Sequence, residues 1–193
     1  MTRISIHEET VSDLREHGRI PISYEVRRTL HVEAVEVGRY RLTERDVAVP
    51  YVKDYDSDGD PPARSVAAFN LTNWVLLVAQ VEAERAGGAV LVFDTPDVDM
   101  LEGRRDLAVV WDLRVAPPYR NQGVGCALWR AAVRWASIRG CRQIKVETQD
   151  VNVPACRFYT RQGCHLGRAV PGAYPDLPHE TQLLWYAEVP PAS

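Results

Sequence analysis

The sequence lacks the features that mark several classes of protein. Its four cysteines form no Cys-x-x-Cys pair and have no histidine or cysteine partner at metal-ligand spacing. No apolar run approaches the roughly 18 residues needed to span a membrane, and the amino terminus lacks the apolar centre of a secretory signal. Scattered thiols are typical of a reducing compartment. We therefore expect a cytoplasmic protein that makes no membrane contact.

Strongly charged runs are also scarce. The net charge is −3 and no basic cluster occurs, so the electrostatic signature of a nucleic-acid-binding protein is missing. The remaining composition, 46% hydrophobic and 25% charged, is ordinary for a globular protein. With 193 residues and no internal repeat, the chain predicts a single domain over 1–193, with a β-rich half over 1–70 and a core over 71–189.

One acidic segment resembles the start of a calcium-binding loop. Asp54–Gly59 matches the pattern D-x-D-x-D-G. The twelfth position of such a loop is a bidentate glutamate, but Ser65 stands there, and Pro61-Pro62 interrupts the second half. We interpret this segment as a solvent-exposed acidic loop, and no metal is expected.

The residue pattern predicts a mixed α/β fold. Residues 20–49 have the character of strands: His31–Val37 alternates apolar and polar residues, Gly38-Arg39 is a predicted turn, and Tyr40–Val49 continues as a strand. A short helix is predicted over Thr10–His17, and a hairpin is predicted from Trp74–Ala83 and Ala89–Phe93, with its turn across Arg85–Gly88. The remaining predicted strands are Leu107–Val115, Gln143–Glu147, Cys164–Arg168 and Leu183–Val189. The remaining predicted helices are Val124–Ile138 and Pro154–Gly163. This order predicts a mainly antiparallel sheet flanked by helices, in which Leu107–Val115 and Gln143–Glu147 are a parallel pair.

The loop Arg120–Gly125 lies between the predicted central strand and a long helix, an arrangement that offers backbone N–H groups to a phosphate. A Walker A loop needs lysine after its last glycine, but Cys126 follows here, which excludes that type. A dinucleotide loop needs a third glycine where Leu128 stands. Glu147 lies about where an acid would hold a ribose, so this alternative stays open. The third alternative is a loop for the pyrophosphate of coenzyme A.

Two segments carry a resemblance to a known family. LRVAPPYRNQGVGCALWRAAVRWA resembles the acyl-CoA loop and helix of the GNAT N-acetyltransferases, with their motif [QR]-x-x-G-x-[GA]. NVPACRFYTRQGC is similar to the second signature of that family, with Cys164 in place of a phenylalanine. The carboxy-terminal half, including Tyr174, is most similar to the streptothricin acetyltransferases. Arg114 departs from that group, because it stands where the group has an acid.

The resemblance implies an acetyl-CoA site and no metal. Backbone groups of Leu113 and Val115 would pair with the pantetheine, and Asn152, besides capping the second helix, would contact the cofactor. Arg120 would add positive charge to the pyrophosphate loop. The loop residues implied in binding are Arg120, Asn121, Gln122, Gly123, Val124, Gly125 and Cys126.

The resemblance also assigns the catalytic groups. Tyr159 would give a proton to the leaving thiolate, whereas its neighbour Phe158 fits the core better. Asp112 and Glu147 are both candidates for the base that takes the proton of the amine, and a chain of water molecules is the alternative. Cys126 and Cys156 have no histidine partner that would make them nucleophiles.

The predicted function is transfer of an acetyl group from acetyl-CoA to a primary amine by direct attack. The acceptor is expected to be a small cationic molecule such as a streptothricin-like antibiotic, and a homodimer is allowed. The alternatives are acetylation of a protein lysine or amino terminus, or a non-catalytic acyl-CoA-binding module.

Overall fold

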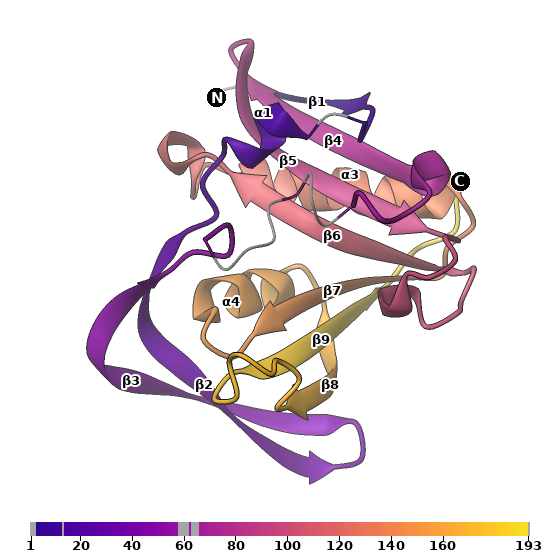
Figure 1. Cartoon of the computed structure of the whole chain (residues 1–193). Helices are drawn as coiled ribbons and strands as arrows, with labels where there is room; N and C mark the ends of the chain where they lie inside the picture. Colours follow the sequence, from indigo (N-terminus) through magenta and orange to yellow (C-terminus); the bar gives the residue numbers. More distant parts are fainter. Residues whose placement is uncertain (1–2, 13, 58–61, 63–65, 193) are drawn as a thin grey trace. The chain divides into compact units, whose positions relative to one another are not determined.

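A computed structural model describes residues 3–12, 14–57, 62 and 66–192. The chain divides into two compact units that alternate along the sequence (Figure 1). The first unit comprises Met1–Ser23, Asp54–Ile144 and Val189–Ser193, and the second comprises Tyr24–Lys53 and Lys145–Glu188. The prediction of a single domain over 1–193 stays a prediction.

The first unit is built on an antiparallel sheet. Its strands are β1 (Ile4–Glu9), β4 (Trp74–Val81), β5 (Glu84–Phe93) and β6 (Leu107–Val115), and they are neighbours in that order. Strands β4 and β5 consist largely of buried valine, leucine and alanine. Because both faces of these strands are covered, their residues form a continuous apolar run and do not alternate between apolar and polar.

The strand β7 (Gln143–Gln149) begins beside β6. Within the first unit, the backbone N–H groups of Arg142 and Gln143 donate to the carbonyl oxygen of Asp106 at 2.7 and 3.3 Å. Asp106 directly precedes β6, so the two strands start at the same end and run on from it. The predicted parallel pair is confirmed at its beginning.

Two helices cover opposite faces of β5. The long helix α3 (Val124–Ile138) packs on β4, β5 and β6, and the short helix α1 (Arg15–Gly18) lies over the other face (Figure 1). A methyl group placed on Gly87 would meet Val124 and Leu128 of α3, both at 3.3 Å. One placed on Gly88 would lie 2.8 Å from Nδ1 of His17 in α1. Because successive residues of a strand point to opposite faces, this glycine pair admits one helix on each face.

The glycine pair explains an error in the predicted hairpin. The turn between β4 and β5 is at Glu82 and Ala83, whose φ angles are 50° and 70°, and not across Arg85–Gly88. Gly87 and Gly88 lie within β5, opposite Ala79 and Val78 of β4. Glycine pairs usually indicate turns, but here they are required by the close packing of the two helices.

The predicted helix over Thr10–His17 is also shorter than expected. Among the described residues of this segment the helix is confined to Arg15–Gly18, because the chain first makes a turn in which Ser12 N–H donates to Oγ1 of Thr10 at 3.2 Å. Such a side-chain bond to the backbone competes with helix formation. The first unit also contains the short 3-10 helices η1 (Leu71–Asn73), η2 (Asp99–Leu101) and η3 (Pro117–Tyr119).

The second unit combines a long hairpin with a small sheet and one helix. Its elements are β2 (Tyr24–Glu36) paired with β3 (Arg39–Lys53), the continuation of β7, the helix α4 (Val153–Arg161), β8 (His165–Pro171) and β9 (Thr181–Glu188). Strand β9 lies between β7 and β8. Asn152 caps α4 as predicted, since its Oδ1 accepts from the N–H of Ala155 at 3.1 Å.

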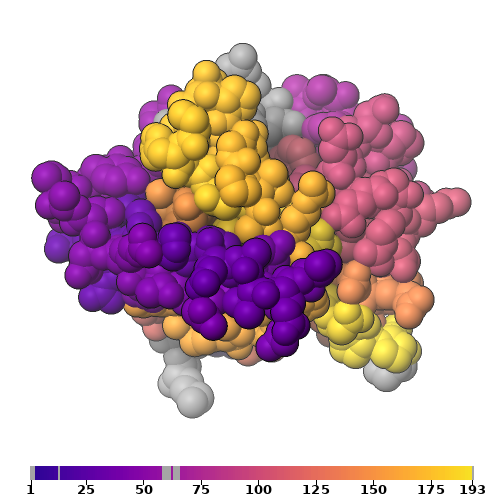
Figure 2. Space-filling model, turned by 90° about the horizontal axis from the view of Figure 1, so that it is seen from below, coloured from indigo at the N-terminus to yellow at the C-terminus, as the bar shows by residue number. Residues whose placement is uncertain are grey.

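The β2–β3 hairpin confirms the predicted strands and the turn at Gly38, whose φ is 70°. Several of its apolar side chains are exposed, namely Val35, Val37, Val49, Tyr51 and Val52. The hairpin contributes the purple surface in Figure 2.

No helix in the described part of the chain is long and apolar enough to cross a membrane. All four cysteines are free thiols. The cytoplasmic location stays a prediction.

The packing at Gly87 predicts a large loss of stability on a small change. In Gly87→Ala the new methyl group would lie 2.6 Å from the backbone oxygen of Arg114, which cannot move without disturbing the β5–β6 pairing. We expect urea unfolding to show a loss of about 1–3 kcal/mol, the usual cost of overpacking. The control is Gly18→Ala, whose methyl group would be 3.7 Å from Pro62 in an ordinary contact. Equal unfolding midpoints for the two variants would contradict this account.

Candidate functional site

The loop Arg120–Gly125 has the geometry of an anion site. Gly123 is the N-cap of α3 with a φ of 88°, which favours glycine. As a glycine, it has no side chain to cap the helix. The N–H groups of Val124 and Gly125 therefore begin the helix without an acceptor inside it. Together with the helix dipole, these N–H groups suit a bound phosphate.

Arg120 fixes this loop to the backbone around it. Its guanidinium donates to the carbonyl oxygens of Pro21 at 2.8 Å, Val115 at 3.0 Å and Ser23 at 3.4 Å. The residue is exposed. Arg120 thus ties the loop to the end of β6 and to residues 21–23, and its predicted contact with pyrophosphate stays a prediction.

Strand β6 carries a bulge close to its candidate site residues. Asp112 pairs with Val90 and Val110 pairs with Leu91, so Trp111 is an extra residue in β6. The Trp111 ring packs edge-on against Trp74, with ring centres 5.2 Å apart. Bulges are enriched next to active sites because they redirect side chains. Leu113 and Val115 follow the bulge and are partly buried.

Asp112 is enclosed by donors. Nε2 of His17 lies 2.7 Å from its Oδ1, and Arg114 donates from Nε to both carboxylate oxygens at 3.0 Å and from Nη2 to Oδ2 at 2.9 Å. Burial raises the pKa of Asp112, but the bonds from His17 and Arg114 outweigh it, so the pKa lies below its usual value. The carboxylate is held as an anion whose side chain is 11% exposed.

Arg114 connects this anion to the acidic segment. Its Nη1 and Nη2 each donate to one oxygen of Asp56 at 2.7 Å, and Nη1 also donates to the carbonyl oxygen of Ile20 at 3.1 Å. Its side chain is only 1% exposed. Burial lowers the pKa of Arg114, but the bonds to Asp56 and Asp112 raise it above its ordinary value. The guanidinium charge is therefore balanced by two carboxylates.

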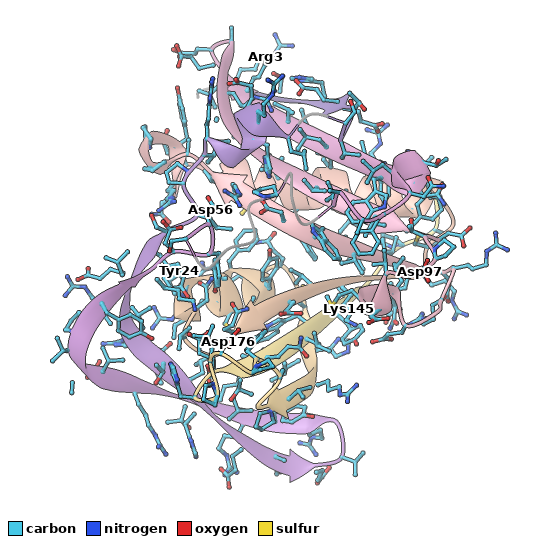
Figure 3. The ribbon with its side chains drawn as sticks, viewed as in Figure 1. Arg3, Tyr24, Asp56, Asp97, Lys145 and Asp176 are labelled. Carbon is cyan, nitrogen blue, oxygen red and sulfur yellow. The ribbon has the colours of Figure 1, made fainter. Side chains whose placement is uncertain are left out.

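Part of the acidic segment therefore has a structural role. Asp56, labelled in Figure 3, is the partner of Arg114, and Oδ1 of Asp54 accepts from the N–H of Asp56 at 3.2 Å. Asp58 and Gly59 lie outside the described residues. Asp54 stabilises a turn and Asp56 forms an ion pair, and the sequence pattern did not indicate these structural roles.

In the second unit, Glu147 of β7 is held by two donors. The hydroxyl of Tyr174 donates to its Oε1 at 2.6 Å, and Nε2 of Gln182 donates to its Oε2 at 2.8 Å. Nε2 of Gln149 in turn donates to the hydroxyl oxygen of Tyr174 at 3.0 Å. Glu147 is partly buried.

Tyr159 is buried on α4, with 5% of its surface exposed. Val153, Cys156 and Tyr159 form the buried face of this helix, whereas Phe158 is only partly buried. The prediction that Phe158 fits the core better is wrong, because the spacing of three residues puts Tyr159 on the inner face. The two rings meet edge-on, with centres 5.0 Å apart.

The buried thiols are poor nucleophiles. Burial raises the pKa of both Cys156 and Cys164 to about 12 and that of Cys141 to about 11. Because the thiolate is the reactive form, these groups are protonated and inert near neutral pH.

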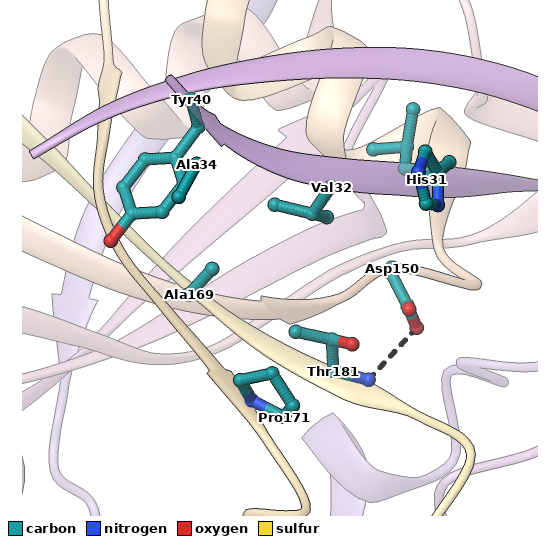
Figure 4. Close-up of a pocket in the computed structure, with 9 residues that line it drawn as sticks. His31, Val32, Ala34, Tyr40, Asp150, Ala169, Pro171 and Thr181 are labelled. Atoms are coloured by element: carbon teal, nitrogen blue, oxygen red, sulfur yellow. Dashed lines mark hydrogen bonds between the residues drawn. The ribbon is translucent and has the colours of Figure 1, made fainter. Parts of the chain in front are cut away.

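Two hollows have walls formed by residues other than those predicted for the site. One in the second unit has a volume of about 200 Å³ and is walled by the β2–β3 hairpin, with Asp150 and Thr181 joined by a hydrogen bond of 3.0 Å (Figure 4). One in the first unit has about 330 Å³ and is lined by residues that include Glu9, His17 and Arg85. Neither is lined by a residue of the predicted site.

Comparison with known proteins identifies the family. The sequence model described as "Acetyltransferase (GNAT) family" matches residues 43–164. The chain is 34% identical to streptothricin acetyltransferase of Streptomyces lavendulae, with 78% of this chain and 76% of that protein covered. It is 30% identical to streptothricin acetyltransferase of Escherichia coli, with 83% of each covered. Its structure is similar to that of a Bacillus anthracis protein described as a streptothricin acetyltransferase and solved with acetyl coenzyme A (TM-score 0.75, 26% identity, 96% and 99% covered).

The chain belongs to the GNAT acetyltransferase family. It is an acetyl-CoA-dependent N-acetyltransferase with the mixed α/β fold expected from the sequence. Acetyl-CoA as the co-substrate is thereby supported. In the described part of the chain, no group of three or more His, Cys, Asp or Glu is arranged to hold a metal ion, and the expectation of no metal stays a prediction.

The predicted residues of this acetyltransferase fall into two groups. The first unit contains Asp112, Leu113, Val115 and Arg120–Cys126, and the second contains Glu147, Asn152 and Tyr159. Sequence reasoning missed His17 and Asp56, the partners of Asp112 and Arg114. They are separated from these partners by 95 and 58 residues, and no local pattern links positions so far apart.

The ion cluster predicts a specific dependence of stability on pH. Because folding lowers the pKa of Asp112, its charge stabilises the fold above the ordinary carboxyl pKa of about 3.9. That contribution is lost as the pH falls through the lowered pKa. We expect the unfolding free energy of the wild-type protein to fall more steeply below about pH 4 than that of Asp112→Asn.

The measurement is urea unfolding at several pH values between neutral and strongly acidic. The exposed Asp97, labelled in Figure 3, supplies the control Asp97→Asn, which should follow the wild-type curve. Parallel curves for wild type and Asp112→Asn would show that folding does not favour the ionised form of Asp112.

Proposed function

We propose that this acetyltransferase acetylates a primary amine of a small cationic molecule of the streptothricin type. The observation that carries this proposal is the similarity to two streptothricin acetyltransferases at 30% and 34% identity over most of the chain. The sequence had one feature against it, since Arg114 replaces an acid of that group. The ion pairs of Arg114 with Asp56 and Asp112 remove this objection, because the guanidinium is buried and its charge is balanced.

The cofactor would be held chiefly by backbone groups of the first unit. The uncapped start of α3 and Gly123 support binding of the pyrophosphate to residues Gln122–Cys126. Leu113 and Val115 would pair with the pantetheine in the manner of an added strand. Asn152, whose Oδ1 already caps α4, would make a further contact. Arg120 would support this site mainly by fixing the loop.

The reaction would be a direct transfer. The neutral amine attacks the thioester carbonyl carbon, a C–N bond forms, and the C–S bond breaks. The departing thiolate takes a proton from the hydroxyl of Tyr159, and the nitrogen loses one proton to a base. The raised thiol pKa of Cys156 supports a path without an enzyme-bound acyl group.

Of the two predicted bases, the contacts favour Glu147. A carboxylate has about four positions for accepting hydrogen bonds. Asp112 already accepts from three N–H groups of His17 and Arg114, one of them shared between both of its oxygens, and its lowered pKa makes it a weak proton acceptor. Glu147 accepts one at each oxygen from the described residues, which leaves capacity for an amine N–H. We therefore propose Glu147 as the group that binds the amine and accepts its proton, and Asp112 as a charged structural anchor.

A thiol-release assay tests the acceptor. Acetyl-CoA is offered with streptothricin, aminoglycosides, polyamines, amino acids and lysine- or alanine-terminated peptides, and free coenzyme A is measured. We expect the highest kcat/KM with a small polycationic amine. A preference for the peptides would favour a protein acetyltransferase instead. Binding of acetyl-CoA with no release for any amine would favour a non-catalytic module.

Removing the proposed acid tests the role of Tyr159. Tyr159→Phe keeps the ring that packs in α4 but removes the proton donor, so we expect kcat to fall by about 10²–10⁴-fold, the usual contribution of general acid catalysis. The KM for acetyl-CoA should change little. Tyr40→Phe, which removes a phenol hydroxyl on the β2–β3 hairpin, is the control. A Tyr159→Phe enzyme with wild-type kcat and pH profile would exclude this role.

A further inference from the structure

We propose that Tyr174, in the loop between β8 and β9, is a positioning residue that holds Glu147 in the orientation required to receive the acceptor amine. This inference rests on the proposed function, because it gives Glu147 the role of amine receptor. Tyr174 lies outside the two sequence motifs that contain the proposed cofactor loop and Tyr159. The argument depends on contacts within the second unit alone.

The direction of the hydrogen bonds is fixed by the groups involved. A phenol has one hydrogen to donate, and its oxygen also accepts. The Tyr174 oxygen accepts from the amide of Gln149 at 3.0 Å, and a carboxylate can only accept. The Tyr174 hydrogen is therefore the one shared with Oε1 of Glu147 at 2.6 Å. The bond is short and charge-assisted, the stronger type of hydrogen bond in proteins.

The two oxygens of Glu147 are held from different elements. Tyr174 binds Oε1 from the loop, and Gln182 of β9 binds Oε2 at 2.8 Å. Glu147 and Gln149 are two residues apart in β7, so their side chains share one face of the strand, and Tyr174 bridges them there. With one donor at each oxygen, the carboxylate cannot rotate without breaking a bond.

This arrangement leaves the carboxylate both ordered and able to bind. A receptor for an ammonium or amine group must hold its orientation before the substrate arrives, since ordering it on binding costs free energy. The two protein donors use about half of the positions at which a carboxylate accepts hydrogen bonds. The remaining positions provide the acceptor capacity that the amine requires. Asp112 lacks this property, because each of its oxygens is already within hydrogen-bond distance of two donor nitrogens of His17 and Arg114.

The test separates loss of Tyr174 from loss of Glu147. Kinetics are measured with the amine selected in the thiol-release assay for wild type, Tyr174→Phe, Glu147→Gln and the double variant. For Tyr174→Phe we expect kcat/KM for the amine to fall about tenfold or more, the size typical of a hydrogen bond to a charged group. The KM for acetyl-CoA should stay within about twofold, because the lost bond concerns only the amine receptor.

The double variant tests whether Tyr174 acts through Glu147. If Tyr174 acts through Glu147, adding Tyr174→Phe to Glu147→Gln should cause little further loss, whereas independent effects would multiply. Gln182→Leu removes the other donor and should lower kcat/KM for the amine in the same direction. Tyr40→Phe is the matched control, since its phenol lies on the hairpin, and it should behave as wild type. Thermal unfolding of each variant monitors folding.

Two results would overturn the proposal. One is wild-type amine kinetics in Tyr174→Phe, and the other is a full multiplicative loss in the double variant. Both are distinguishable from failure of the proposed function, which would appear as no acetyl transfer to any amine by the wild-type protein.

Discussion

The first unit depends on the ion pairs that the buried guanidinium of Arg114 makes. A cation that is 1% exposed is tolerated only when its charge is balanced, and here Asp56 and Asp112 supply the two negative charges. His17 closes the cluster from α1 by bonding to Asp112. Two segments distant in sequence, α1 and the loop at Asp56, are thereby fixed to the end of β6, the strand that leads into the predicted cofactor loop. A charge that seemed out of place in the sequence is thus a structural centre.

Close packing on β5 complements this ion cluster. His17 can reach Asp112 only because Gly88 leaves room for its ring, and the start of α3 can approach only because Gly87 has no side chain. The α3 residues Val124 and Leu128 lie against Gly87, at the end of the helix that offers its N–H groups to a phosphate. Two adjacent glycines thereby permit an ion cluster on one face and the predicted pyrophosphate loop on the other.

The two predicted bases carry the same chemical group in different surroundings. Asp112 and Glu147 are both carboxylates near strand ends, and the sequence had no means of ranking them. In the structure Asp112 is saturated with donors and its pKa is lowered, whereas Glu147 has one donor at each oxygen. The difference arises from Arg114, Tyr174 and Gln182. Of these, Arg114 is two residues from Asp112, but Tyr174 and Gln182 reach Glu147 only through the folding of the last two strands.

The sequence by itself determined the local and periodic features: strand β6, the helix α3, the capping of α4 by Asn152 and the glycine loop with its family motif. Each depends on residues within about one element, where backbone geometry and spacing decide the outcome. Only the tertiary structure decided that Gly87-Gly88 lies within a strand and that Asp56 neutralises Arg114. Those outcomes depend on packing and charge pairing between residues up to 95 positions apart, which local preference does not encode.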